Sequence, residues 1–304
     1  MERRERLYPY WFILPALIST FIVTLLPTLY TIYLSFSNWS LYHFTRAQGL
    51  RFVGLQNYRE ILAGAEVATF LRVFAWTIVW SATSVFFSLV VGLLFALVLN
   101  RKDLTGRSLY RTLLIVPWAM PSFITVLMWG GLLNSQFGAM NRLLVACGLH
   151  GVDWLSDPGW ARFSVVLVNV WLSFPFMMSI ILGALQSIPG DMYEAAAIDG
   201  AKKITVFWRL TVPMLRNAMV PVVITSFAFA FNNFIGIYLL TAGGPPLPGG
   251  GSAGATDILI SYTFKLGFSL SRYGLASAYA VVIFFLIGIL SFINSSLSGA
   301  FNEG

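Results

Sequence analysis

Six long stretches of this chain are nearly free of charged residues, and each has about the length of a membrane-spanning helix. They cover residues 12–36, 73–99, 109–133, 163–186, 217–241 and 273–297. A helix needs roughly 20 apolar residues to cross a hydrocarbon core about 30 Å thick. Continuous apolar runs are typical of helices, because the strands of a membrane barrel alternate apolar and polar residues. The sequence therefore predicts an all-α polytopic membrane protein with six transmembrane helices.

Basic residues predict how these helices are oriented. An even number of spans places both termini on one side of the membrane, and Lys and Arg are enriched in cytoplasmic loops. With cytoplasmic termini, eleven of the nineteen basic residues lie inside: Arg3, Arg4, Arg6, Arg101, Lys102, Arg107, Arg111, Lys202, Lys203, Arg209 and Arg216. The first apolar stretch lacks a clear cleavage site after the basic segment MERRERLYPYWF. We therefore expect it to remain as a span rather than be removed as a signal peptide.

The composition disfavours several classes of function. The net charge of +7 does not indicate a nucleic-acid partner, because the basic residues flank apolar spans, where they set topology and meet anionic headgroups. Cys147 is the single cysteine, and the two histidines, His43 and His150, are far apart, so no metal site is expected. The chain has no phosphate-binding Gly-rich motif and no catalytic constellation. We expect a protein that is not an enzyme and holds no cofactor.

The near absence of charge inside the spans also bears on the mode of transport. Ion-driven carriers commonly place Asp, Glu, Lys or Arg at bilayer depth, so the sequence disfavours such a carrier. A stand-alone secondary carrier or channel for small polar solutes remains the alternative. It predicts uptake without any ATPase.

Residues 187–216 form a charged interruption that the predicted topology places in the cytoplasm. Pro189 ends the fourth span, Asp191 is a candidate N-cap, and Glu194 completes a capping box three residues later. Gly200 is expected to end this short helix in a left-handed conformation. Capping is the simplest role for Glu194.

A second helical piece is expected to carry Phe207, Trp208 and Leu210 and to end at Pro213. Apolar aromatic residues beside charges on a short loop helix are suited to filling a groove of a partner protein. The alternative is an interfacial helix that rests among the lipid headgroups.

Motifs of this loop resemble the EAA loop of permease subunits in bacterial ATP-binding-cassette importers. The matching residues are Glu194, Ala195, Ala196, Asp199, Gly200, Ala201, Phe207, Leu210 and Pro213. Further matches span nearly the whole chain, among them FVGLQNY, NNFIGIYLLTAGGP and YGLASA. Together they resemble the carbohydrate-uptake branch, closest to the first permease subunit of maltose or maltodextrin systems. Compared with that subunit, the chain is expected to lack extra leading helices and a large outer domain.

The resemblance implies a type I importer permease with residues 1–304 as one transmembrane domain in the bacterial inner membrane. Its implied partners are a second homologous permease, a cytoplasmic ATPase dimer that binds ATP and Mg, an extracytoplasmic sugar-binding protein, the sugar and the lipid bilayer. Glu194 would be the polar anchor of the coupling loop, Gly200 its turn, and Phe207 with its apolar neighbours the part that docks. Closure of the ATPase dimer would then drive alternating access.

Polar uncharged residues in the fourth and fifth spans are the candidates for sugar binding. Asn169, Leu172, Ser173 and Phe176 have spacings of three and four, which place them on one helix face. On the fifth span the candidates are Ser226, Phe229, Asn232 and Asn233, of which Ser226, Phe229 and Asn233 are expected to share a face. Hydrogen bonding between helices is the alternative role.

By resemblance these positions match the sugar site of the maltose subunit, with Ser173 in place of Gly, Phe176 in place of Tyr and Ala230 in place of Asn. Maltose, maltodextrin or another α-glucoside such as trehalose is the implied cargo.

The predicted outer loop, residues 242–271, begins with a run rich in Gly and Pro that is not expected to form a helix or a buried strand. It is either a flexible connector or a contact for the binding protein.

Overall fold

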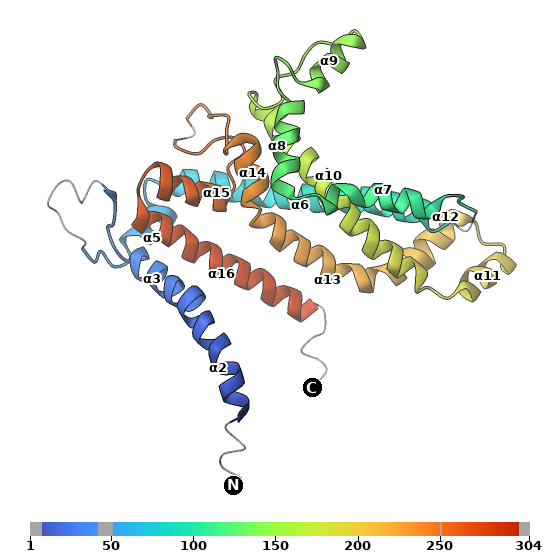
Figure 1. Ribbon diagram of the computed structural model, residues 1–304, viewed down its shortest axis with the longest axis horizontal. Coiled ribbons are helices and arrows are strands. Elements are labelled where there is room, and N and C mark those ends of the chain that lie inside the picture. Colours follow the sequence, from blue (N-terminus) through green and yellow to red (C-terminus); the bar gives the residue numbers. More distant parts are fainter. Residues whose placement is uncertain (1–7, 42–50, 102, 250, 298–304) are drawn as a thin grey trace. The chain divides into compact units, whose positions relative to one another are not determined.

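The computed structural model in Figure 1 describes residues 8–41, 51–101, 103–249 and 251–297. Its helices are α2 (Tyr8–Thr20), α3 (Leu26–Ser35), α5 (Gln56–Ala63), α6 (Val67–Leu99), α7 (Arg107–Ala119), α8 (Ser122–Leu132), α9 (Ala139–Ala146), α10 (Pro158–Gln186), α11 (Gly190–Ile198), α12 (Lys203–Val206), α13 (Val212–Phe231), α14 (Phe234–Thr241), α15 (Leu259–Phe264) and α16 (Tyr273–Leu297). Within the described ranges the extended pairings are isolated bridges, so the all-α prediction is confirmed. Arg3, Arg4, Arg6, His43 and Lys102 lie outside these ranges.

Four continuous helical stretches are long and apolar enough to cross a membrane. They are Trp11–Ser35, Val67–Leu99, Pro158–Gln186 and Lys203–Phe231. The number of spans rises to five if α7 and α8, which meet at an angle of 91°, together form one broken span. The break lies at Met120, whose backbone is extended (ψ 144°) because the proline that follows it disfavours helical geometry.

The predicted span 217–241 is wrong in its boundaries. The structure has one long helical stretch, Lys203–Phe231, and a separate helix α14 after the Asn232–Asn233 pair. The predicted span 273–297 coincides with α16. Among the described residues, four or five stretches meet the length and composition expected of a span, so the exact count of six is not confirmed.

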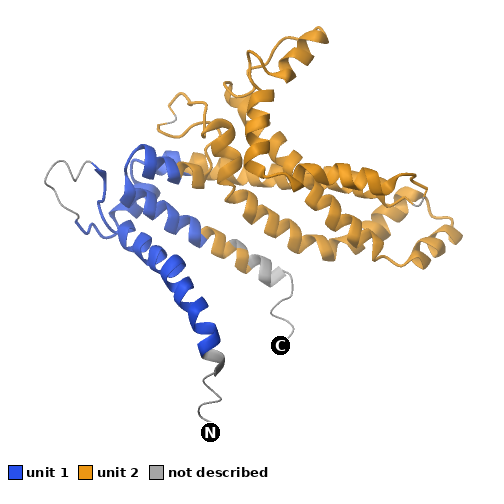
Figure 2. Cartoon of the chain, in the orientation of Figure 1, with its two compact units in different colours: residues 1–70, 263–285 blue, residues 71–262, 286–304 orange. Residues whose placement is uncertain are grey.

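Figure 2 divides the chain into two compact units, residues 1–70 with 263–285 and residues 71–262 with 286–304. In the first unit, the amide nitrogen Nδ2 of Asn57 on α5 donates to the carbonyl oxygens of Ser35 and Ser37, both at 2.8 Å. The hydroxyl groups of Ser35 and Tyr58 lie 2.7 Å apart. These bonds fix α5 against the end of α3.

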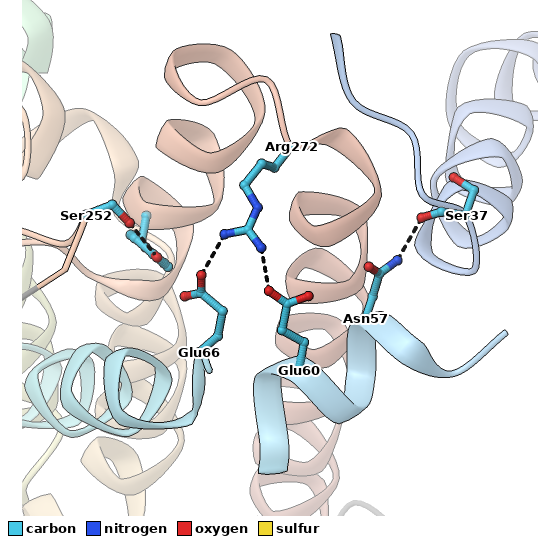
Figure 3. A network of polar contacts seen from close by, with 7 residues as sticks. Ser37, Asn57, Glu60, Glu66, Ser252 and Arg272 are labelled. Atoms are coloured by element: carbon cyan, nitrogen blue, oxygen red, sulfur yellow. Dashed lines mark hydrogen bonds and ion pairs between the residues drawn. The ribbon is translucent and has the colours of Figure 1, made fainter. Parts of the chain in front are cut away.

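Arg272 carries the main ion pairs of the first unit. Figure 3 shows its guanidinium between Glu66, to which Nη1 donates at 2.7 Å, and Glu60, to which Nη2 donates. Burial lowers the pKa of Arg272, but its hydrogen bonds to Glu66 and Glu60 raise it, and the net shift is upward. Arg272 therefore stays charged and joins the start of α16 to α5 and the residues that precede α6.

In the second unit, α10 is the central helix and contacts α7, α8, α13 and α14. A Cβ atom at Gly92 of α6 would lie 2.7 Å from Cβ of Met177 and 2.8 Å from the backbone nitrogen of Met178. Only glycine lets α6 approach α10 this closely. The indole nitrogen of Trp80 donates to the carbonyl oxygen of Ala230 at 3.0 Å, which joins α6 to α13.

The Gly/Pro-rich run after α14 has no helix before α15, as predicted, but its described residues are not a loose connector. Thr256 and Asp257 are 0% and 1% exposed. The carboxylate of Asp257 accepts from the backbone nitrogen of Gly254 at 2.8 Å and from the hydroxyl of Ser261 at 2.9 Å. Arg162 of α10 donates to the carbonyl oxygen of Ala255 at 2.9 Å, so α10 holds this loop in place.

Candidate functional site

A cavity of about 540 Å³ lies in the second unit among α6, α10, α13 and the start of α14. Its volume is within the range of small-molecule sites, roughly 300 to 1,000 Å³. All eight residues that the sequence pointed to line it: Asn169, Leu172, Ser173, Phe176, Ser226, Phe229, Asn232 and Asn233. The other lining residues are Ser84, Val85, Ser88, Trp118, Met177, Ala230, Phe234 and Ile235. No described residue of this lining carries a charge.

The two sets of candidates reach the cavity in different ways. Those on α10 share a helix face, as their spacing predicted. On the other side, Ser226 and Phe229 belong to α13, but Asn232 and Asn233 lie at the break between α13 and α14. The prediction that Ser226, Phe229 and Asn233 share one continuous helix face is therefore wrong, and Asn233 enters the cavity because the helix ends before it.

Asn233 joins the two sides of the cavity. Its Nδ2 donates to Oδ1 of Asn169 at 2.9 Å, and its own Oδ1 accepts from the backbone nitrogen of Gly236 at 3.0 Å. The second bond makes Asn233 the N-cap of α14. Asn169 is only 7% exposed. This hydrogen bond links α10 to the start of α14, which is the alternative role considered for these amides, and both amides also line the cavity.

Aromatic rings form the apolar part of the lining. Trp118 of α7 and Phe176 of α10 lie with ring centroids 6.0 Å apart, and Phe229 is 76% exposed. Neutral amide and hydroxyl groups beside such ring faces suit an uncharged solute with many hydroxyl groups.

Sequence reasoning missed Trp118, Ser84 and Ser88. The two serines, four residues apart on α6, carried a possible signal, because hydroxyl groups on one face of an apolar helix need partners.

The loop of residues 187–216 begins with α11. Pro189 occupies the N-cap position, and no side chain caps the helix, so the predictions of Asp191 as N-cap and Glu194 as part of a capping box are wrong. Proline supplies the extended geometry (ψ 133°) that starts the helix. Asp191 lies instead in the first turn, where its negative charge favours the positive end of the helix dipole.

The other end of α11 closes as predicted at Gly200. This residue has φ +69°, and its backbone nitrogen donates to the carbonyl oxygen of Ala197 at 3.1 Å. The nitrogen of Ala201 donates to the carbonyl oxygen of Ala196 at 3.0 Å. These two bonds form a Schellman motif, whose left-handed position favours glycine.

Pro213 does not end the second helical piece, contrary to prediction. α12 continues through a π-helical turn, Phe207–Thr211, into α13, which has a proline in its first turn. A π-helical turn widens the helix and frees backbone groups, so a proline fits at the start of the next turn. Leu210 lies in this π-helical turn.

The coupling candidates occupy successive parts of this loop. Glu194, Ala195 and Ala196 lie on α11, and Asp199 is its C-cap. The rings of Phe207 and Trp208 pack edge to face at 5.1 Å. The hydroxyl groups of Tyr193 and Thr211 lie 3.2 Å apart and tie the two helical pieces together.

Comparison with known proteins assigns the chain to a family. The family model described as "Binding-protein-dependent transport system inner membrane component" matches residues 88–299. The chain belongs to this family.

Members of the family with curated names match most of the chain. It is 40% identical over 279 residues to the galactooligosaccharides transport system permease protein GanP of Bacillus subtilis, covering 91% of this chain and 66% of GanP. It is 47% identical over 249 residues to the maltose/maltodextrin transport system permease protein MalF of Vibrio parahaemolyticus, covering 80% of this chain and 47% of MalF. The chain thus spans between about half and two thirds of these relatives' lengths.

The fold of the family is also found in solved structures. A bacterial ABC transporter "involved in the import of the acidic polysaccharide alginate" superposes with a TM-score of 0.78 at 22% identity, over 98% of this chain and 97% of that one. The chain therefore has the fold of an ABC-importer membrane subunit.

Proposed function

We propose that this chain is the membrane-spanning subunit of an ATP-driven, binding-protein-dependent sugar importer that works by alternating access. The cavity carries the proposal, because it combines amides, hydroxyl groups and aromatic rings with no charged side chain among its described lining. Sugars are bound through hydrogen bonds to their hydroxyl groups and through contact of their apolar ring faces with aromatic side chains. The names of GanP and MalF support a sugar cargo.

The cargo we propose is a neutral oligosaccharide, with maltose, maltodextrin or another α-glucoside such as trehalose as the leading class. Phe176 and Ala230 offer no hydrogen-bonding side chain where the resemblance to the maltose subunit implies Tyr and Asn. The hydroxyl groups of a sugar must then find other partners in this cavity. A panel of α-glucosides and galactosides is therefore the appropriate set of test sugars.

The energy for transport is proposed to come from a cytoplasmic ATPase dimer that binds ATP and Mg and docks on residues 187–216. Within this chain α11 has no buried residue, and Ile198 and Trp208 are 87% and 61% exposed. Exposed large apolar side chains on a charged loop are suited to contact with a partner protein. Closure of the ATPase dimer would move this loop with α10 and α13 as a rigid body and switch the cavity between the two sides of the membrane.

Membership of the family supports the remaining partners that we propose. We propose a second homologous permease, an extracytoplasmic sugar-binding protein that meets the outer loops including residues 242–271, and a bacterial inner-membrane location with cytoplasmic termini. This chain itself performs no catalysis in the proposal.

Copurification tests the assembly. An affinity-tagged chain extracted in mild detergent should bring with it a similar permease and an ATPase in fixed ratio. A chain that purifies alone and still mediates sugar uptake would support a stand-alone carrier instead.

A further inference from the structure

Thr77, Ser81, Ser84 and Ser88 are spaced three or four residues apart on α6, and their hydroxyl groups fall into two groups. The hydroxyl of Thr77 donates to the carbonyl oxygen of Val73 at 2.7 Å, and that of Ser81 donates to the carbonyl oxygen of Thr77 at 2.8 Å. The hydroxyl oxygens of Ser84 and Ser88 are buried and have no hydrogen-bond partner in the described structure. Their residues are 0% and 1% exposed.

An unpaired buried hydroxyl is unfavourable, particularly within a membrane protein. A helix offers each serine a ready partner in the carbonyl group four residues earlier, and Thr77 and Ser81 use it. Ser84 and Ser88 do not. Both line the cavity, so the feature that distinguishes them from Ser81 is their contact with the candidate sugar site.

The amide groups of Asn169 and Asn233 already use part of their hydrogen-bonding capacity within the chain. Asn233 uses Nδ2 on Asn169 and Oδ1 on the backbone of Gly236. A ligand with many hydroxyl groups needs both donors and acceptors around it, and a serine hydroxyl supplies both. Ser84 and Ser88 therefore hold hydrogen-bonding capacity that the folded chain leaves unused.

We propose that Ser84 and Ser88 are sugar-binding residues that form hydrogen bonds with hydroxyl groups of a neutral oligosaccharide when the cavity is occupied. The proposal rests on the sugar-importer function proposed above and adds α6 as a further wall of the site. Four residues of helix rise about 6 Å, so the two hydroxyls can meet neighbouring positions on one sugar unit. Alternating access moves the surrounding helices, which gives the sugar access to groups that are covered in the present state.

The test compares Ser84→Ala, Ser88→Ala and the control Ser81→Ala in the intact permease–ATPase complex in lipid nanodiscs. Equilibrium binding of maltotriose, galactobiose and trehalose is measured without the binding protein, together with the thermal unfolding midpoint. We expect Ser84→Ala and Ser88→Ala each to weaken binding of the accepted sugar roughly tenfold, equivalent to about 1.4 kcal/mol. Their unfolding midpoints should equal or exceed that of wild type, because no existing hydrogen bond is lost. Ser81→Ala should bind like wild type.

Monodeoxy derivatives of the accepted sugar separate direct contact from packing. For at least one deoxy position, wild type should lose affinity while the matching serine variant shows no further loss. Unchanged binding in both serine variants, or additive losses with every deoxy sugar, would overturn the proposal. Lower unfolding midpoints with an equal binding loss in Ser81→Ala would also overturn it. If wild type binds none of the three sugars and also shows no ATP-dependent uptake of them in the presence of the binding protein, the proposed function itself fails, and this inference fails with it.

Discussion

Replacement of Asn233 by alanine removes two interactions that the structure assigns to one side chain. Asn233 caps α14 through Gly236 and donates to Asn169 across the cavity. Loss of an N-cap costs about 1 kcal/mol. A hydrogen bond between membrane helices contributes about 0.6 kcal/mol on average and at most about 1.7 kcal/mol. We therefore expect Asn233→Ala to lower the free energy of unfolding by about 1.5 to 3 kcal/mol.

Two matched variants separate the contributions. Asn233→Ser keeps a side-chain oxygen for the cap, so it should lose only the bond to Asn169, about 0.6 to 1.7 kcal/mol. Asn232→Ala removes an exposed amide of the cavity for which the structure shows no side-chain hydrogen bond among the described residues. It should reduce sugar uptake and leave stability unchanged. Denaturant unfolding in bicelles measures all three, and an Asn233→Ala protein as stable as wild type would refute the reasoning.

Four further substitutions test other parts of the molecule. Glu194→Lys reverses a charge at the proposed docking surface and should cost several kcal/mol of ATPase affinity; normal ATPase binding to membranes that carry it would contradict this role. Gly200→Val places a branched side chain at φ +69°, with a strain of roughly 1 to 2 kcal/mol, so uptake should fall while membrane insertion is retained; unchanged uptake would argue against a coupling turn. Gly92→Val should push α6 away from α10 and lower the unfolding free energy by about 1 to 3 kcal/mol, whereas a wild-type transition would show that the helices do not pack so closely. Arg272→Gln leaves the Glu60 and Glu66 carboxylates without their cation and should destabilise by about 1 to 3 kcal/mol, and an increase in stability would count against the ion pairs.

The parts of the fold that depend on local chemistry were predictable from sequence. Apolar runs of sufficient length located the helices, and Gly200 marked the end of α11 because a left-handed position favours glycine. The predicted boundaries failed at Asn232 and Asn233, where two amides end a helix that hydropathy alone extends to residue 241. At Pro213 the sequence predicted a helix end where the structure has a continuous helix, because the preceding π-helical turn accommodates the proline.

For the candidate site, too, residues on one helix were predictable from the sequence, and contacts between helices were not. Spacing along α10 placed Asn169, Ser173 and Phe176 on one face, and the structure has them in one cavity. Ser84 lies far away in sequence and reaches that cavity only because Gly92 lets α6 pack closely on α10. Such contacts arise from tertiary packing, which the spacing within one helix does not encode. The burial of the Gly/Pro-rich outer loop is likewise a tertiary effect, since distant residues such as Arg162 hold it.

Sugar uptake into proteoliposomes tests the central claim most directly. The chain is reconstituted with the permease and ATPase that the proposal predicts will copurify with it. The binding protein is loaded with radiolabelled sugar on the outer side, and ATP is enclosed in the lumen. The account predicts uptake that requires both ATP hydrolysis and the binding protein, and that is lost with Glu194→Lys while its cavity is intact. Uptake that proceeds without ATP, driven by a proton or sodium gradient, would contradict it.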